Sequence, residues 1–292
     1  MKRSVERFVC RLLVMLPLLL LFPRPVVAEE EAAGDGWRFQ NGVLTVTTDD
    51  GLADFIDYNG GSISIIRWGS APMEALLQAK RIVFASGVRE VHLLQGGIPS
   101  MYNDPLRSLS FADTVEKIIF NQWRPFVEKI VVDSGNDHYY VQNGILIERE
   151  SMTACMFEYG RTYAAVPAGV KTIGRNCFYG HTALKTLILP EGLENIEKWA
   201  FADCENLRKI DLPESLRWIE EYAFADCIRL NYLVFPPQVQ FRLPEGDTGL
   251  LSMTGAQVVV ISSCKTVMDR FVFTSRYDPC YPKALVFLDK LP

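Results

Sequence analysis

Hydrophobic positions recur every 23 residues in the middle of the chain. Pro167, Pro190, Pro213 and Pro236 mark the period, and seven apolar columns keep step between them. The columns are Val170/Leu193/Leu216/Val239, Ile173/Ile196/Ile219, Phe178/Phe201/Phe224, His181/Cys204/Cys227, Leu184/Leu207/Leu230, Leu187/Ile210/Leu233 and Leu189/Leu212/Phe235. A fixed period of this length indicates a solenoid, in which each coil buries its apolar positions against the neighbouring coils.

The pattern inside one coil predicts a strand and a turn. Residues 184–189 alternate, with Leu187 and Leu189 on one face and Thr186 and Ile188 on the other, which is typical of a strand with one buried face. Stacked coils would pair these strands in parallel. The proline that follows ends the strand, because it has no N–H to donate. Residues 197–202 (EKWAFA) suit a short helical turn on the opposite side.

The pattern P-x-G/S-V/L-x-x-I-x-x-x-A/C-F-x-x-C/H-x-x-L-x-x-L/I-x-L/F resembles the BspA-type leucine-rich repeat of bacterial surface and secreted proteins. Residues 136–167 are similar to the hairpin-like insert of that family, with Asn136, Tyr139, Gly144 and Leu146 as its core. NGVLTV, residues 41–46, resembles the strand that opens many of these domains. The resemblance implies an α/β repeat fold: a right-handed leucine-rich-repeat solenoid with a parallel sheet of short strands and short helical turns.

Less regular coils can be traced outward by the same columns. They are marked by Ile82, Phe84, Gly87, Val88 and Val91; by Leu106, Leu109, Phe111, Val115 and Ile118, with Trp123 in the phenylalanine column; by Val127, Ile130 and Val132; and by a last strand at Val259 and Ile261. We therefore expect one domain over residues 37–292. Its parts are degenerate coils (41–132), a hairpin-like insert (133–165), regular coils (166–239), and a loop with a C-terminal cap (240–292).

The first 28 residues predict a secretory signal peptide. Basic residues precede an apolar run at residues 12–22, and Val26, Val27 and Ala28 supply small residues for cleavage. The alternative is an uncleaved N-terminal anchor. Residues 29–36 are acidic and small, and we expect a disordered lead-in there. No second apolar stretch is long enough for a membrane span, so we expect no transmembrane segment after cleavage. The predicted location is secreted or cell surface, or periplasmic if the cell has an outer membrane.

The charge balance argues against two classes of partner. The whole chain has 30 basic and 35 acidic residues. Removing residues 1–28 takes away five basic residues and one acidic residue, which leaves 25 against 34 and a net charge near −9. Such a surface disfavours nucleic acid and anionic membranes as partners.

Six cysteines remain after the predicted cleavage, and an even number in an exported chain invites disulfides. Cys204 and Cys227 occupy one column of adjacent coils, where small buried hydrophobes are favoured over a bridge. Cys155 and Cys177 also fall at apolar positions and are expected to be buried thiols. Cys264 and Cys280 lie beyond the repeat, where a disulfide would fasten the cap.

No catalytic constellation is visible in the sequence. There is no G-x-S-x-G, H-E-x-x-H, C-x-x-C or phosphate-binding glycine loop. Of the three histidines, His181 falls in a repeat column, and His92 and His138 have no metal partner at close spacing. The sequence therefore predicts no enzyme activity, no cofactor and no metal site.

Two sets of residues are candidates for binding. The outward strand positions of the regular coils form two columns, which Val83, Val131 and Val260 extend as an apolar stripe; their members are Thr186, Ile188, Lys209, Asp211, Tyr232 and Val234. A contiguous exposed apolar patch indicates a partner site, although β-branched residues also favour strands for their own sake. The second set is aromatic: Trp199, Trp218 and Tyr222, which could stack on sugars or pack between coils.

These features predict an exported protein-interaction or adhesion module. The family resemblance implies a host-matrix or cell-surface protein as the partner. A carbohydrate-binding surface protein that uses the exposed aromatics is the alternative. An enzyme-associated domain and a purely structural scaffold remain open.

Overall fold

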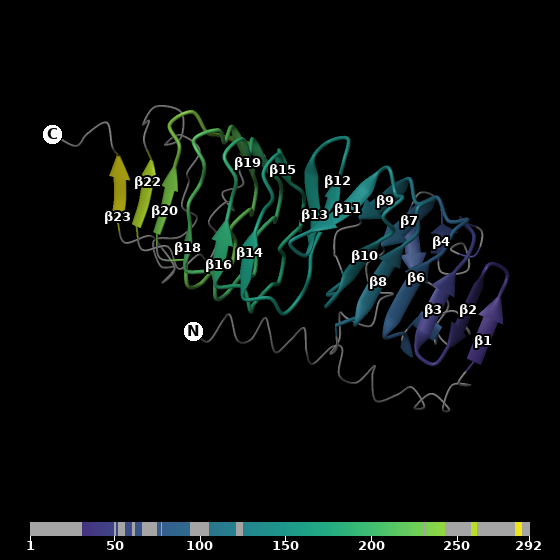
Figure 1. Ribbon diagram of the computed structural model, residues 1–292. Coiled ribbons are helices and arrows are strands. Elements are labelled where there is room, and N and C mark those ends of the chain that lie inside the picture. The colour runs from purple at the N-terminus through teal and green to yellow at the C-terminus, as the bar shows by residue number, and fades with distance from the viewer. Residues whose placement is uncertain are drawn as a thin grey trace, which may run out of the picture.

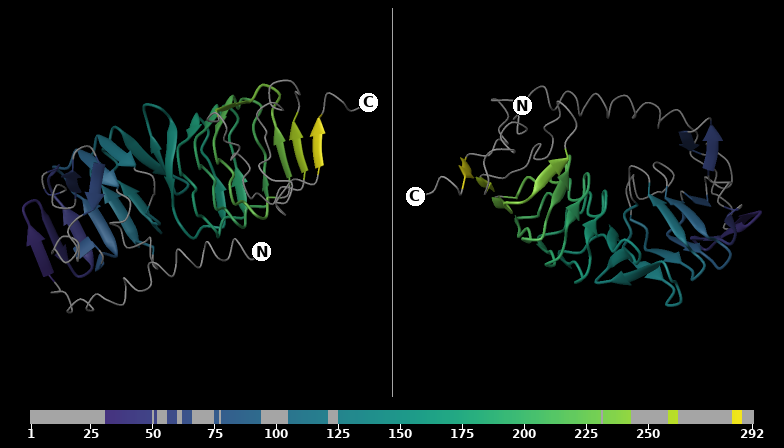
Figure 2. Two further views of the ribbon diagram at one scale, coloured as in Figure 1. Left: turned by 180° about the vertical axis from the view of Figure 1, so that it is seen from behind. Right: turned by 90° about the horizontal axis from the view of Figure 1, so that it is seen from above.

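The computed structural model describes residues 31–49, 51, 56–59, 62–65, 75–76, 78–93, 105–120, 125–230, 232–242, 258–261 and 284–287. The predicted signal peptide, Trp123 and the candidate disulfide Cys264–Cys280 lie outside these residues. The described elements are strands joined by turns, and the coils follow one another along a curved path (Figures 1 and 2). No helix within the described ranges has the length and apolarity to cross a membrane.

Three large sheets make up the described coils. The N-terminal sheet has the order β1 (Glu31–Gly34), β2 (Trp37–Gln40), β3 (Val43–Val46), β6 (Arg81–Phe84), β8 (Ser108–Phe111), β10 (Ile130–Val132). The long sheet has the order β11 (Tyr139–Gln142), β12 (Ile145–Glu148), β13 (Thr153–Phe157), β15 (Thr172–Ile173), β17 (Asn195–Ile196), β19 (Trp218–Glu220), β21 (Gln240–Arg242). The C-terminal sheet has the order β14 (Tyr163–Ala165), β16 (Thr186–Ile188), β18 (Lys209–Ile210), β20 (Tyr232–Phe235), β22 (Val258–Ile261), β23 (Ala284–Phe287).

Two smaller sheets complete the described strands. β7 (Glu90–Leu93) pairs in parallel with β9 (Lys117–Phe120), on the N-terminal coils. β4 (Ile56–Asn59) pairs with β5 (Ser62–Ile65) in an antiparallel hairpin.

The predicted columns are confirmed as ladders of adjacent residues. Ile173 lies next to Ile196, and Ile196 next to Ile219, in parallel strands of the long sheet. In the C-terminal sheet Leu187 pairs with Ile210. Each regular coil thus contributes one strand to each of two sheets, and both strands point an apolar column inward.

The expected helical turn over residues 197–202 is wrong. Trp199 and Asp203 adopt left-handed backbone angles, with φ of 57° and 59°. The amide of Phe201 donates to the carbonyl of Ala223 in the next coil, whereas the amide of Ala200 donates back three residues within its own coil. Every second N–H is thus used between coils, so the i→i−4 pattern of an α-helix cannot form. The segment is a ladder of turns that closes the third side of the coil.

Phenylalanine rings stack through the centre of the regular coils. The centroids of Phe178 and Phe201 are 5.3 Å apart, and those of Phe201 and Phe224 are 5.4 Å apart. Phe157 extends this stack at 4.9 Å from Phe178, although it stands only 21 residues earlier and belongs to the insert. The 23-residue period therefore failed to identify it.

The column of His181, Cys204 and Cys227 caps backbone carbonyls. Each side chain contacts the carbonyl oxygen of a phenylalanine one coil earlier: His181 Nε2 to Phe157 at 3.0 Å, Cys204 Sγ to Phe178 at 3.1 Å and Cys227 Sγ to Phe201 at 3.1 Å. The expectation of buried thiols in this column is confirmed, because both cysteines are free and fully buried. Cys155 and Cys177 are free and buried as well.

The insert separates two hydrophobic cores. Leu146 on β12 packs with the core of the N-terminal coils, whereas its neighbours Ile145 and Ile147 pack with the core of the regular coils. β12 pairs antiparallel with both β11 and β13, and a bulge on β13 places Cys155 and Met156 together on the N-terminal side. Because both faces are buried, these strands form a wall shared by the two halves of the solenoid.

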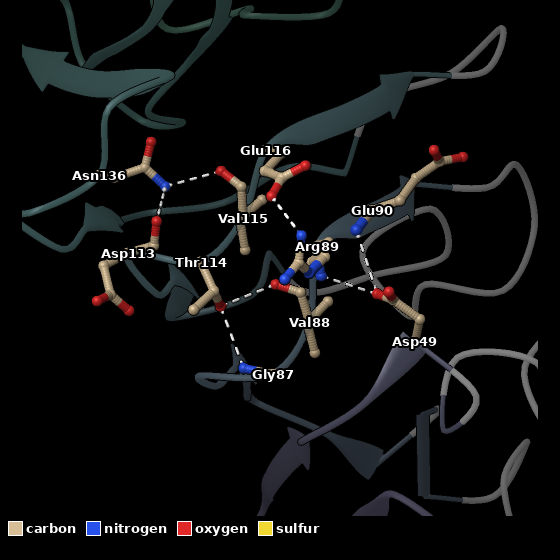
Figure 3. Close-up of polar contacts among 10 residues, drawn as sticks. All are labelled: Asp49, Gly87, Val88, Arg89, Glu90, Asp113, Thr114, Val115, Glu116 and Asn136. Carbon is tan, nitrogen blue, oxygen red and sulfur yellow. Dashed lines mark hydrogen bonds and ion pairs between the residues drawn. The ribbon is translucent and has the colours of Figure 1, made fainter.

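The polar contacts of the N-terminal coils match those of the regular coils, which supports the traced alignment. Thr114 Oγ1 accepts the amide of Gly87 at 3.1 Å and donates to the carbonyl of Val88 at 2.9 Å (Figure 3). In the regular coils Gly192 N donates to Ser215 Oγ at 2.9 Å, and Ser215 Oγ donates to Leu193 O at 2.7 Å. A hydroxyl one coil later thus fastens the same turn in both halves.

Two residues of the resemblance motif anchor the insert to the N-terminal coils. The buried Asn136 amide donates to the carbonyls of Ala112 and Val115, at 2.8 Å and 2.9 Å, and its oxygen accepts the amide of Tyr139 (Figure 3 shows Asn136). The Tyr139 hydroxyl accepts the amide of Ile118 at 3.0 Å. Backbone groups that would otherwise end the N-terminal coils unpaired are satisfied in this way.

The structure differs from the expectation at two further places. Residues 31–34, expected to be part of a disordered lead-in, form β1, because their backbone pairs antiparallel with β2 whatever their side chains are. Beyond the predicted last strand, β22, the parallel strand β23 continues the C-terminal sheet.

Candidate functional surfaces

The outward positions of the C-terminal sheet lie in two adjacent columns, as predicted. Thr186 lies between Tyr163 and Lys209, and Lys209 is followed by Tyr232. In the second column Ile188 lies beside Ala165, and Val234 beside Val260. We call the outward residues of β14, β16, β18 and β20, together with Asp211, the outer strand face.

The outer strand face alternates apolar and charged positions. Ile188 is 50% exposed, and Val234 is half-buried. Between their strands lie Lys209 and Asp211, both exposed and joined by an ion pair of 2.9 Å. Such an exposed pair contributes only about 0–1 kcal/mol to stability. The face therefore offers two apolar positions on either side of one charge pair.

The predicted apolar stripe does not run unbroken along the molecule. Val83 and Val131 belong to the N-terminal sheet, where both align with Ser110. The strands on either side of the insert, β10 and β14, belong to different sheets. The expectation of one stripe is therefore corrected to two shorter columns, because the insert interrupts the strand ladder.

Tyr163 is an exposed member of the outer strand face that the sequence analysis missed. Its side chain is 52% exposed, and it lies beside Thr186 on β14. It stands 23 residues before Thr186, so the period itself could have identified it. The insert signature over the same stretch hid that relation.

Trp199 and Tyr222 pack between adjacent coils. Their ring centroids are 6.0 Å apart, and Lys198 Nζ lies 4.7 Å from the Trp199 ring and 5.8 Å from the Tyr222 ring. Lys198 is also ion-paired with Glu221. The alternative that these aromatics pack between coils therefore describes this pair better than free platforms for a ligand.

Trp218 lies in another column, on the outward face of the long sheet. It aligns with Asn195 in the preceding coil and with Gln240 in the following one. The guanidinium of Arg242 lies 4.2 Å from the centre of its ring. A polar hollow of about 370 Å³ opens beside it, lined by Glu194, Asn195, Ile196, Glu197, Arg217, Trp218, Glu220 and Arg242.

The histidines have structural roles in the described part of the chain. His181 is buried, and both ring nitrogens face carbonyl oxygens, those of Tyr179 and Phe157. Burial lowers the pKa of His181 below its ordinary value, against the opposing effect of these carbonyls. His92 contacts Glu90 at 2.8 Å. Within the described ranges, no cluster of three His, Cys, Asp or Glu side chains is placed to hold a metal ion.

Several solved structures resemble this chain at low sequence identity. They include the pneumococcal vaccine antigen PcpA (15% identity, 79% of this chain and 81% of that one, TM-score 0.47) and a leucine rich cell surface protein from Faecalibacterium prausnitzii (14%, 82% and 89%, TM-score 0.45). A leucine-rich repeat protein from Bacteroides capillosus matches with 22% identity over 44% of this chain and 100% of that one, with a TM-score of 0.38. At these values the likenesses say nothing about what this chain binds. None of the curated proteins compared with it matches.

A family model gives the more specific result. It describes the BspA type leucine rich repeat region and matches residues 153–245 in six copies. The match begins at β13, contains the regular coils with their parallel ladders, and coincides with the segment where the 23-residue period is clearest. The chain is thus a BspA-type leucine-rich repeat protein, with residues 153–245 as its repeat region.

Proposed function

We propose that this chain is an exported protein-interaction module and that the outer strand face binds its partner. The observation that supports the proposal most is the exposure of Tyr163 and Ile188, both half or more exposed, on neighbouring strands of one rigid parallel sheet. Apolar groups held on a preformed surface bind with little loss of conformational entropy. The Lys209–Asp211 pair at the centre supplies charge for partner selection.

The partner class follows from the charge and from the flatness of the face. The predicted mature chain is acidic, which disfavours nucleic acid and anionic lipid. A sheet face built from several coils matches a folded protein surface better than a small molecule, which requires a concave site. We propose a protein on a host cell, in the extracellular matrix or on another cell as the partner, in line with the family resemblance.

The first test compares two isoleucines of equal exposure. Ile188 and Ile228 are both 50% exposed, but only Ile188 lies on the outer strand face. Ile188→Asp should weaken binding to immobilised matrix proteins or to a cell-surface protein fraction by at least about tenfold, the scale of an anchor residue. Ile228→Asp should leave binding unchanged. Equal binding by both variants, with both folded, would contradict the proposal.

A second test concerns export. Mass spectrometry of the protein recovered from the culture medium or from the cell surface should find an N-terminus at Glu29, after the small residues of the predicted cleavage site. Recovery only of the intact chain inside the cell would contradict export.

A further inference from the structure

We infer that the hollow beside Trp218 is a separate site that binds a neutral pyranose ring of a glycan. It lies on the long sheet, not on the C-terminal sheet that carries the outer strand face. Its ligand class is therefore independent of the protein partner proposed above.

The hollow exists because side-chain size changes abruptly along one column. The outward column of the long sheet runs Thr172, Asn195, Trp218 in successive coils. The first two side chains are small and bond to each other, Asn195 Nδ2 to Thr172 Oγ1 at 3.2 Å. The indole of Trp218 is much larger than its neighbour Asn195. A step is left in front of the ring, on the side of the preceding coil.

Only one face of the Trp218 ring is taken by a neighbour in the described residues. Arg242 comes from β21, the strand that follows Trp218 in the sheet, and its guanidinium lies over the ring at 4.2 Å. It is held near there by Glu220, 3.9 Å away. Because Arg242 approaches from the following coil, the opposite ring face is directed toward Asn195 and the hollow. An aromatic face at the side of a polar hollow is suited to stacking against the C–H face of a sugar.

The remaining lining groups suit hydroxyl groups. Asn195 and Arg217 offer an amide and a guanidinium, and no hydrogen bond of the Arg217 side chain occurs within the described ranges. Glu194 offers a carboxylate that already pairs with Lys171 at 3.0 Å, and that hydrogen bond lowers the pKa of its carboxyl group. Planar groups of this kind bond two neighbouring hydroxyls at once, as donor or as acceptor.

The charges of the lining favour a neutral ligand over an anionic one. Three carboxylates, of Glu194, Glu197 and Glu220, stand against two guanidinium groups. Glu197 and Glu220 also accept backbone amides, those of Arg175 at 2.8 Å and Lys198 at 3.1 Å, which keeps both in their charged form. An acidic sugar would meet net repulsion. A volume of about 370 Å³ is at the small end of ligand sites, which matches one or two sugar rings.

The test titrates the purified chain with neutral and acidic sugars. The probes are the methyl glycosides of glucose, galactose and N-acetylglucosamine, with N-acetylneuraminic acid as the anionic comparison. Saturation-transfer NMR should show a neutral pyranoside bound with a Kd of about 1 mM, as expected for one ring in a shallow site. The indole N–H signal of Trp218 should shift on titration, which needs no variant.

Matched variants locate the site. Trp218→Ala should weaken sugar binding by about tenfold or more, whereas Trp199→Ala, in the stack between coils, should leave it within about twofold. Arg217→Ala should weaken it, and Arg208→Ala, an exposed arginine outside the hollow, should not. Ile188→Asp should keep full sugar binding, which separates this site from the outer strand face.

Four results would overturn the inference. They are no binding of any neutral pyranoside at about ten times the expected Kd, unchanged binding by folded Trp218→Ala, a Trp218 indole signal that does not move, and a preference for N-acetylneuraminic acid. Stronger binding of an acidic or basic peptide at the same hollow would replace the sugar with a protein ligand.

Discussion

The thiol of Cys204 donates a hydrogen bond of 3.1 Å to the backbone carbonyl of Phe178 in the preceding coil. Cys227 repeats this contact one coil later. Burial raises the pKa of Cys204 well above its usual range, and it raises that of Cys227 to about 12. A thiol in this position is a hydrogen-bond donor of the core and a poor nucleophile.

We therefore predict that both thiols resist alkylation in the folded protein. Iodoacetamide at pH 8 should label neither Cys204 nor Cys227 until guanidinium chloride unfolds the chain, because the thiolate is disfavoured and the sulfur is buried. Peptide mass spectrometry gives the readout, and the denatured sample is the control. Rapid labelling of the native protein, or a peptide that links the two cysteines by a disulfide, would contradict the free-thiol column.

Replacing His181 by cysteine should reduce the acid sensitivity of the fold. Burial lowers the pKa of His181 from 6.5 in the folded chain, so below that pH the unfolded chain binds more protons than the folded one. This contribution to stability is present above about pH 6.5 and is lost as the pH falls toward the folded-state pKa. In His181→Cys a thiol, as in the next two coils, can donate to Phe157.

The comparison for this prediction is His138→Cys, because His138 is exposed. Urea unfolding from pH 7.5 to 4.5 should give a shallower decline for His181→Cys than for the natural chain, and an unchanged decline for His138→Cys. The same slope in all three proteins would show that His181 does not sense pH.

Tyr139→Phe should change the alkaline limit of stability. Burial raises the pKa of Tyr139 to about 12. Between pH 10 and 12 the unfolded chain has lost this proton and the folded chain retains it, so stability falls as the pH rises through that window. The phenylalanine variant lacks this decline. It should also lose about 1–3 kcal/mol at neutral pH, because the amide of Ile118 loses its acceptor.

Tyr140→Phe is the control for that experiment, since the neighbouring ring points into the other core. Denaturant unfolding at pH 8, 10 and 11.5 should separate the two variants. A decline in Tyr139→Phe as steep as in the natural chain would place the titrating group elsewhere.

Two adjacent truncations on β12 should damage opposite halves of the molecule. Leu146→Ala removes a fully buried side chain from the N-terminal core, and Ile147→Ala removes one from the core of the regular coils. Each should cost about 2–5 kcal/mol. Hydrogen exchange should rise in β8 and β10 for Leu146→Ala, and in β15 and β17 for Ile147→Ala. Matching exchange patterns would mean that the wall transmits the damage and does not separate the cores.

The repeat columns could be predicted from the sequence because each column is a physical ladder. Ile196 packs on Ile173 and Ile219 for the same reason in every coil, so the period is written directly in the residues. The turn ladder could not be predicted in this way. EKWAFA has a helix-compatible composition, and what excludes a helix is the amide of Phe201 bonding to the next coil, a contact that local propensity does not contain.

The candidate surfaces followed the same division. Thr186, Ile188 and Lys209 were placed correctly because they alternate with the buried column. Tyr163 was missed because a hairpin interrupts the period before it. The Trp218 hollow depends on the difference in size between Trp218 and Asn195, and on Arg242 from a later coil, so it becomes visible only once the coils are stacked.

The wall formed by the insert has a consequence for how such chains can change in length. Residues on its two sides meet different cores, so a coil duplicated or deleted on one side leaves the packing on the other side untouched. Recombination between repeats could lengthen one arm while the other keeps its surface. The insert would then be the fixed point from which each arm varies, and the two arms could acquire partners on separate evolutionary schedules.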